Sequence, residues 1–208
     1  MLKNVIIKKI NILTGLILYK NNSRKAYSLN KLNLSNSKVH INIEIKAKSS
    51  HQDKFRGILK SLNANFRGTD HQTDTYFNVK IGRLKLREGN IENHLIYYER
   101  EDKKGPKQSN VILYKSNPES SLKEILTKSL GILVTVKKQR EIYFVDNIKF
   151  HLDAILDLGT FVEIEAIDKD GTIGKEKLLE QCTNYMNLFE INKEDLISVS
   201  YSDLLVVK

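Results

Sequence analysis

Three segments of this chain place ionisable side chains at every second residue. The segments are 42–48 (NIEIKAK), 83–87 (RLKLR) and 161–165 (FVEIE). Side chains alternate between the two faces of a β-strand, so each segment predicts one aliphatic face and one charged face. A single strand of this kind is typical of a sheet with a solvated face. Several together, including Lys138 with Arg140 and residues 149–153 (KFHLD), favour charged faces turned toward a common polyanion, with a cation between it and the carboxylates.

The elements that must position these residues are eight strands and about four helices within residues 39–208. The expected strands cover 39–48, 74–79, 83–88, 94–101, 110–115, 133–145, 148–153 and 160–166. The expected helices lie near 55–62, 118–130, 174–188 and 193–205. Asn117 is expected to cap the second helix, with Pro118 at its first position, and Gly131 to end it. A segment of this length suits one domain with a sizeable core.

The charged strand faces could point to water or into a closed sheet. If they pointed to water, the aliphatic faces would fill a barrel and the amphipathic helices would have little to cover. If they point inward, the helices can pack on the aliphatic outer faces. The sequence therefore predicts an α+β fold: an eight-stranded antiparallel β tunnel or barrel with a polar interior and helices packed outside. Such an interior requires Lys and Arg to be balanced by carboxylates and ligand, because an unpaired buried ion costs on the order of several kcal/mol.

The net charge of +9 is concentrated at the start of the chain. Residues 1–43 hold eight basic residues and no acid, which leaves +1 for the remainder. Residues 1–38 are therefore interpreted as a basic leader, either disordered or a targeting segment, and residues 39–208 as the domain. The expected location is cytoplasmic, with a mitochondrial transit peptide or an extended start codon as explanations of the leader. A nucleic-acid partner is not expected, since few aromatic residues are interleaved with the leader's charges.

No stretch reaches the roughly 20 apolar residues that a membrane span requires. The single cysteine, Cys182, excludes an internal disulfide and a multi-cysteine zinc site, and is consistent with a reducing compartment. Its helical spacing from Leu178, Tyr185 and Met186 predicts a core position.

Eight short segments follow one another in a characteristic order. They are 42–46 (NIEIK), 74–77 (DTYF), 82–88 (GRLKLRE), 96–100 (IYYER), 105–107 (GPK), 138–140 (KQR), 151–153 (HLD) and 159–165 (GTFVEIE). In this order and spacing they resemble the CYTH superfamily of triphosphate tunnel metalloenzymes, within its class IV adenylyl cyclase-like, thiamine triphosphatase-related branch. The resemblance covers about Ile41 to Leu205. It implies an eight-stranded tunnel that binds a small-molecule triphosphate with Mg²⁺ or Mn²⁺, in agreement with the inward-facing charges predicted above.

The resemblance also implies roles for individual residues. Lys46 and Glu44 are the expected catalytic residues. The expected metal ligands are Glu44, Asp153, Glu163 and Glu165. The expected substrate-binding residues are Lys48, Arg83, Lys85, Arg87, Arg100, Lys138, Arg140 and Lys149. Asn42 stands where the family's ExExK motif has its first glutamate, and an amide contributes an oxygen ligand but no charge.

The expected reaction is attack at phosphorus with metal stabilising the developing charge. Hydrolysis of a triphosphate is the leading hypothesis, cyclisation of ATP to cyclic AMP is the alternative, and Asn42 keeps a non-catalytic polyphosphate or nucleotide binder open. Three further residues have two interpretations each. His151 is either a tunnel residue or a structural one, Asp74 is favoured as a turn-orienting residue, and Lys107 either closes over the tunnel mouth or is solvated.

Overall fold

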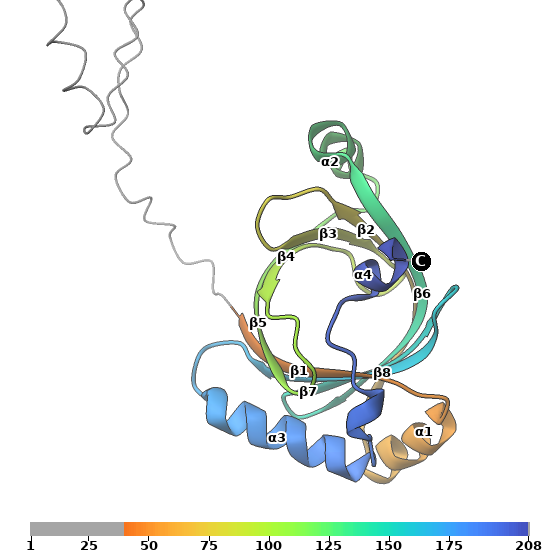
Figure 1. The fold of residues 1–208 in the computed structure, drawn as a ribbon, viewed down its shortest axis with the longest axis vertical. Helices are drawn as coiled ribbons and strands as arrows, with labels where there is room; N and C mark the ends of the chain where they lie inside the picture. The colour runs from red at the N-terminus through yellow and green to blue at the C-terminus, as the bar shows by residue number, and fades with distance from the viewer. Residues whose placement is uncertain (1–39, 208) are drawn as a thin grey trace, which may run out of the picture. The chain divides into compact units, whose positions relative to one another are not determined.

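The computed structural model describes residues 40–207, so the expected leader lies outside the described residues. Eight strands form one closed antiparallel barrel in the order β1-β5-β4-β3-β2-β6-β7-β8. Figure 1 looks along this barrel, and the strands form a ring. The strands are β1 (His40–Lys48), β2 (Asn65–Phe77), β3 (Arg83–Glu88), β4 (His94–Arg100), β5 (Lys107–Lys115), β6 (Ile132–Val145), β7 (Ile148–Ile155) and β8 (Gly159–Asp168). The predicted eight-stranded antiparallel α+β fold is confirmed.

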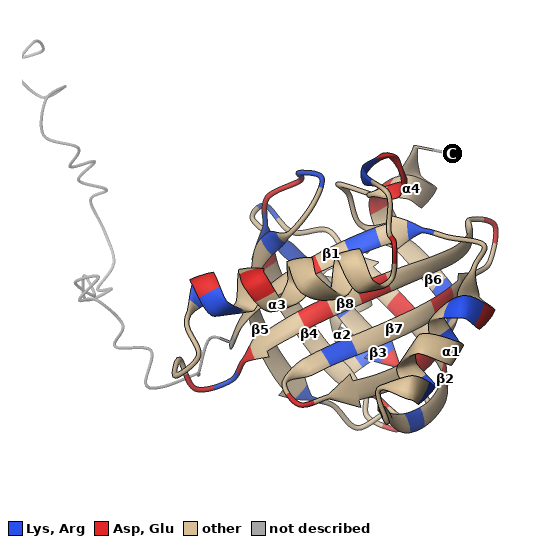
Figure 2. Ribbon diagram, turned by 90° about the horizontal axis from the view of Figure 1, so that it is seen from below, with Lys and Arg blue, Asp and Glu red and all other residues tan. Residues whose placement is uncertain are grey.

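The aliphatic strand faces lie outside the barrel, under two helices. Helix α1 (Gln52–Ser61) and helix α3 (Lys175–Leu188) bury side chains against Ile43, Ile45 and Ile164 of β1 and β8. Figure 2 shows α3 lying along the outer face of β1 and β8. Leu178 and Cys182, one helical turn apart, are fully buried there, which confirms the core position predicted for the cysteine. Burial of each such aliphatic side chain contributes about 1.5–3 kcal/mol, so the helices hold the sheet with its charged face inward.

A third helix, α4 (Tyr201–Val206), lies over one end of the barrel and within its outline in Figure 1. Ser200 caps it: its hydroxyl accepts from the Asp203 N–H, and Asp203 accepts in return from the Ser200 N–H. This reciprocal cap satisfies two backbone donors of a very short helix. Tyr201 at its first position is buried against Phe161 and Val136, so the helix presents one aromatic side chain to the tunnel.

Two helix predictions were wrong at their boundaries. Helix α2 (Leu122–Leu130) begins after Ser121, because the Asn117 side chain accepts from the Glu119 N–H and forms a turn instead of capping the helix. The expected helix 193–205 is a 3₁₀ turn, η1 (Lys193–Asp195), an extended segment and then α4. The segment is extended because Leu196 bridges to Ala47 and the Ile197 N–H donates to the Lys46 carbonyl.

Strand β2 is longer than the predicted strand 74–79 and begins at Asn65. It pairs with β6 along nearly its whole length. Its first half is polar, so period-two hydrophobicity could not reveal it. In the described part of the chain, no helix is long and apolar enough to cross a membrane.

Candidate active site

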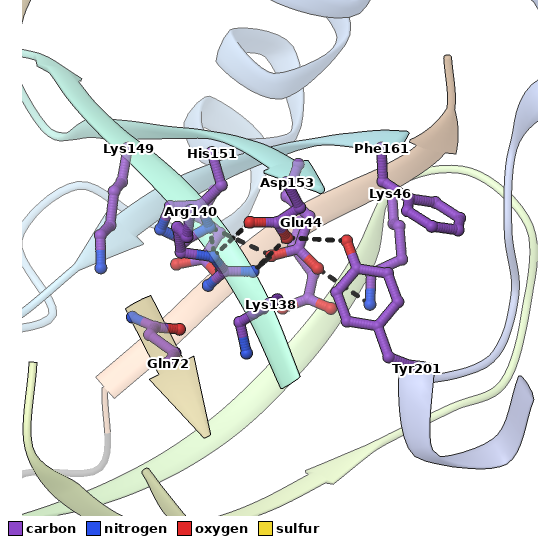
Figure 3. A network of polar contacts seen from close by, with 12 residues as sticks. Glu44, Lys46, Gln72, Lys138, Arg140, Lys149, His151, Asp153, Phe161 and Tyr201 are labelled. Atoms are coloured by element: carbon purple, nitrogen blue, oxygen red, sulfur yellow. Dashed lines mark hydrogen bonds and ion pairs between the residues drawn. The ribbon is translucent and has the colours of Figure 1, made fainter. Parts of the chain in front are cut away.

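The inward faces of the strands enclose a cavity of about 290 Å³. Its lining includes eight basic residues and four carboxylates. The buried carboxylates of Asp74 and Asp153 contact the same basic groups, so positive charge is in excess by two. The basic residues are Lys46, Lys85, Arg87, Arg100, Lys138, Arg140, Lys149 and Lys169; the acidic residues are Glu44, Glu92, Glu163 and Glu165. Figure 3 shows several of these side chains converging from β1, β6 and β7.

Asp74 is the anion around which one group of cations is arranged. Its carboxylate lies 2.5 Å from Lys138 Nζ, 3.0 Å from Lys85 Nζ and 2.8 Å from Arg87 Nε. Burial opposes ionisation, but the three cations outweigh it and hold the pKa of Asp74 well below its usual range. Asp74 is fully buried, so it fixes three basic side chains from β3 and β6 in one place before any ligand binds.

Arg140 is the centre of a second buried network. Its guanidinium donates to both oxygens of Asp153, at 2.6 and 2.5 Å, and to Glu163 at 2.8 Å. The Tyr201 hydroxyl donates to Asp153 at 2.9 Å. Lys46 lies 2.9 Å from Glu163 and 3.6 Å from the centre of the Tyr201 ring. The fork of Arg140 thus holds Asp153 on one side and Glu163 on the other, and Tyr201 ties helix α4 to the same network.

Two carboxylates of the cavity face each other directly. Glu44 on β1 is the cross-strand partner of Glu165 on β8. Like charges in this position destabilise a sheet unless a cation lies between them. Burial, with Glu44 and Glu163 nearby, raises the pKa of Glu165 to about 7. A cation bound between Glu44 and Glu165 would therefore offset the repulsion between their two carboxylates.

His151 completes a group of potential metal ligands. One ring nitrogen and one oxygen each from Glu163 and Glu165 lie within 4.8 Å of one another. Burial, followed by Arg140 and Lys149, lowers the pKa of His151 to about 3, so the imidazole is neutral. Three carboxylates and a neutral imidazole fit a divalent cation, because all four can offer it a lone pair. Glu165, whose pKa is raised to about 7, would release its proton when the cation binds.

Arg100 holds donors that no described residue satisfies. Its Nη1 donates to Glu44, whereas Nε and Nη2 are buried and have no hydrogen-bond partner within residues 40–207. The side chain is only 4 % exposed. Unsatisfied buried donors on a cation are costly, and an anion in the cavity would satisfy them. The amide oxygen of Asn42, two residues before Glu44, is also buried without a described partner.

The structure brings most of the expected site residues into the cavity. The expected residues that line it are Glu44, Lys46, Lys85, Arg87, Arg100, Lys138, Arg140, Lys149, Glu163 and Glu165. Three others lie elsewhere. Lys48 is exposed at the end of β1, Arg83 pairs with Asp102 and Asp203, and Asp153 lies behind Arg140, fully buried.

Sequence patterns did not indicate Glu92 or His94, because Glu92 lies in the loop before β4 and His94 is the first residue of that strand. Glu92 pairs with Lys149 at 2.5 Å and Arg87 at 2.9 Å, and both it and His94 line the cavity. The loop is held by Asp70, whose carboxylate accepts from the Ile91 and Glu92 N–H groups. Glu92 lies outside every strand, so no periodic pattern in the sequence indicated it.

Neither interpretation of Lys107 is correct, since this lysine is almost fully buried. Its ammonium donates to the carbonyls of Ile197 and Ser198, each at 2.9 Å. Burial and then Arg100 lower the pKa of Lys107 to about 8. Lys107 therefore anchors the extended segment that leads into α4.

The fold and cavity define an antiparallel β-tunnel protein with a charged interior. The chain matches the CYTH domain over residues 40–201 and belongs to that family, which confirms the resemblance drawn from its motifs. A candidate adenylate cyclase of Methanocaldococcus jannaschii is 29 % identical over 181 residues, covering 79 % of this chain and 98 % of that protein.

The solved structures that are similar to this chain include the following two. The protein PH1012 of Pyrococcus horikoshii has a TM-score of 0.66 at 24 % identity, over 78 % of this chain and 98 % of that one. A candidate adenylyl cyclase of Hippeastrum, described as having a dominant triphosphatase activity, has a TM-score of 0.52 at 14 % identity, over 80 % and 94 %. At these identities the two structures support the fold.

Glu165 gives the metal-free protein a measurable pH dependence. A carboxyl whose pKa is about 7 when folded and near 4.5 when unfolded binds more protons in the folded state. Stability from this group is therefore lost as the pH rises from about 4.5 to 7. We expect the parent to lose up to about 3 kcal/mol relative to Glu165→Gln between pH 5 and 8, measured by urea unfolding in a chelator. His151, whose shift is opposite in sign, is present in both proteins and cancels. If the unfolding free energies of the parent and of Glu165→Gln change in parallel with pH, the raised pKa of Glu165 is contradicted.

Proposed function

We propose that this protein is a divalent-metal-dependent enzyme that binds a triphosphate in the tunnel and hydrolyses it. The observation that carries this proposal is a cavity inside the barrel with excess positive charge and with buried Arg100 donors that lack a described partner. A triphosphate carries about four negative charges near neutral pH, so a divalent cation would balance the charge that the excess of two in the site leaves over. The family membership and the triphosphatase activity named for the Hippeastrum protein support the same class of substrate.

The phosphate chain would lie along the basic side chains of β3, β4 and β6. Arg100 offers phosphate oxygens the two donors that no described residue satisfies. Arg87 and Arg140, whose forks bind Asp74 and Asp153, add positive charge. Lys85 and Lys138 act as point charges. Asp74 holds Lys85, Arg87 and Lys138 in position, so little side-chain entropy remains to be lost when the ligand binds. These contacts bind and orient the triphosphate.

Glu44, Glu163 and Glu165 would hold Mg²⁺ or Mn²⁺ beside the phosphates. The bound ion would stabilise charge that develops on the phosphoryl oxygens. Lys46, fixed between Glu163 and the Tyr201 ring, places a positive charge at the same edge of the cavity, where it would stabilise the leaving oxygen. Glu44 would hold Arg100 against the substrate as well as contact the metal.

Cyclisation of ATP is a second candidate, and one observation favours it. Ile96 and Leu113, which face each other across β4 and β5, line the cavity together with Val111 and Ile167. Apolar walls are of little use to inorganic triphosphate but would contact a base or another organic group. The 29 % identical relative is named as a candidate adenylate cyclase. In a cyclase the ribose hydroxyl, rather than water, attacks phosphorus.

A product analysis separates these possibilities. The full chain is incubated with ATP, tripolyphosphate or thiamine triphosphate and with Mg²⁺ or Mn²⁺. Orthophosphate as the product supports hydrolysis, and pyrophosphate with cyclic AMP supports cyclisation. If the protein binds a triphosphate tightly but forms no product, it is a non-catalytic binding protein and the enzymatic proposal is overturned.

We expect tripolyphosphate to stabilise the protein through Arg100. A ligand present at 100 times its dissociation constant and bound only by the native state adds about 2.7 kcal/mol to the unfolding free energy. Arg100→Lys keeps a positive charge beside Glu44 but removes the two unpartnered donors, so affinity should fall about 10- to 100-fold. Calorimetry and thermal unfolding measure both effects.

Arg67→Lys is the matched control for this prediction. Arg67 lies on β2, is exposed and does not line the cavity, so its variant should bind tripolyphosphate as the parent does. Equal affinity of the Arg100→Lys and Arg67→Lys variants would show that the unpartnered donors do not contact phosphate.

A further inference from the structure

His151 faces two of the carboxylates that the proposed metal site contains. Its Nδ1 lies 3.1 Å from Glu163 Oε2 and 3.8 Å from Glu165 Oε1. The cross-strand register explains this placement, because His151 on β7 is directly opposite Glu163 on β8. The ring is 1 % exposed and lines the cavity. A histidine is thus built into the acidic wall of the tunnel.

The hydrogen bonding of this histidine is incomplete. Nδ1 shares a hydrogen bond with Glu163 Oε2. Nε2, the other ring nitrogen, is buried with no partner within residues 40–207. A buried polar atom left unsatisfied in this way points to a bound group that the chain itself does not supply.

The separations in this group are those of neighbouring ligands on one ion. Ligand atoms about 2.1 Å from a metal are about 3.0 Å apart at right angles and about 3.4 Å apart at a tetrahedral angle. The Nδ1 to Glu163 distance of 3.1 Å lies within this range, and the Nδ1 to Glu165 distance of 3.8 Å lies above it. Small side-chain adjustments would therefore bring all three atoms onto one cation.

We propose that Nδ1 of His151 is a ligand of the divalent cation, beside Glu163 and Glu165, and that the site consequently prefers Mn²⁺ to Mg²⁺. The inference rests on the metal site proposed above. Cation binding at Nδ1 would place the ring proton on Nε2, where an oxygen of a bound triphosphate would accept its hydrogen bond. The buried atom without a partner is then satisfied in the loaded protein.

The preference for Mn²⁺ follows from ligand chemistry. Mg²⁺ selects oxygen ligands and retains water, whereas imidazole nitrogen suits transition metals. Asn42, in place of a further carboxylate, leaves three glutamates and so reduces the negative charge that would favour a hard ion. A neutral nitrogen ligand adds affinity for Mn²⁺ without adding charge.

The test is pulsed electron paramagnetic resonance of Mn²⁺ bound to the untagged full chain. Nuclear modulation from a directly bound imidazole nitrogen is expected in the parent and absent in His151→Asn, whose amide can still donate to Glu163. Competition titrations should show that His151→Asn lowers Mn²⁺ affinity about tenfold or more while changing Mg²⁺ affinity less. His94→Asn, which removes the other described histidine that lines the cavity, should retain the nitrogen signal.

The outcomes separate this inference from the proposed function. Mn²⁺ binding without a nitrogen signal, or with a signal that survives in His151→Asn, would overturn the role of His151 and leave the carboxylate site standing. If the parent binds no divalent cation even with tripolyphosphate present, both the metal site and the histidine ligand are refuted.

Discussion

Replacing Asp74 with asparagine is expected to destabilise the empty protein by about 3–5 kcal/mol. The variant keeps the size of the side chain but leaves Lys85, Arg87 and Lys138 buried without their shared counter-ion. Tripolyphosphate should then stabilise the variant more than it stabilises the parent, because the ligand supplies the missing negative charge. Urea unfolding with and without tripolyphosphate measures both quantities.

Asp102→Asn is the control for Asp74. Asp102 also pairs with an arginine, Arg83, but its side chain is 43 % exposed, so the change should cost about 1 kcal/mol or less. If Asp74→Asn is no more destabilising than Asp102→Asn, the three cations are not held as a buried group around one anion.

The second large effect is expected for the reaction itself. Glu165→Gln should lower turnover with Mg²⁺ by about two orders of magnitude or more, equivalent to about 3 kcal/mol in the activation barrier. Triphosphate binding should remain measurable, because the basic contacts on β3, β4 and β6 are unchanged. Steady-state kinetics and calorimetry with tripolyphosphate distinguish the two quantities.

Glu88→Gln is the matched control, since Glu88 pairs with Lys123 and does not line the cavity. It should retain both turnover and metal affinity. Full Mg²⁺-dependent activity in Glu165→Gln would remove Glu165 from the metal site. Loss of triphosphate binding in the same variant would show instead that the carboxylate organises the basic residues.

The barrel, and the inward direction of its charged strand faces, could be predicted because both depend on period-two patterns in the sequence. In β1, β3 and β8 each charged residue alternates with an aliphatic one, and only an inward-facing sheet lets α1 and α3 cover Ile43, Ile45 and Ile164. The family motifs then identified most of the residues that meet in the cavity. Each motif is a local signal in the sequence, and the closed sheet brings the residues of the separate motifs together.

The remaining features depend on contacts between segments that carry no periodic signal. Lys107 was predicted at the tunnel mouth or in solvent, but its place is set by two carbonyls about 90 residues later in the chain. Asp74 is predicted to orient a turn, but it lies within β2 and binds three cations that come from β3 and β6. The role of Glu92 depends on Asp70, which accepts from its N–H and so holds the loop in place. No single-segment pattern contains such information.

The closure of the barrel by its first and last strands sets the order in which the protein can fold. β1 and β8 share eight residue pairs, although about 120 residues separate them in the chain. A ribosome adding about 5–20 residues per second needs roughly 6–24 s to deliver β8 after β1. During that time β1 has an unpaired edge and an uncovered aliphatic face, a state that favours chaperone binding or aggregation. Glu44 and Glu165 therefore become neighbours only after β8 has been synthesised.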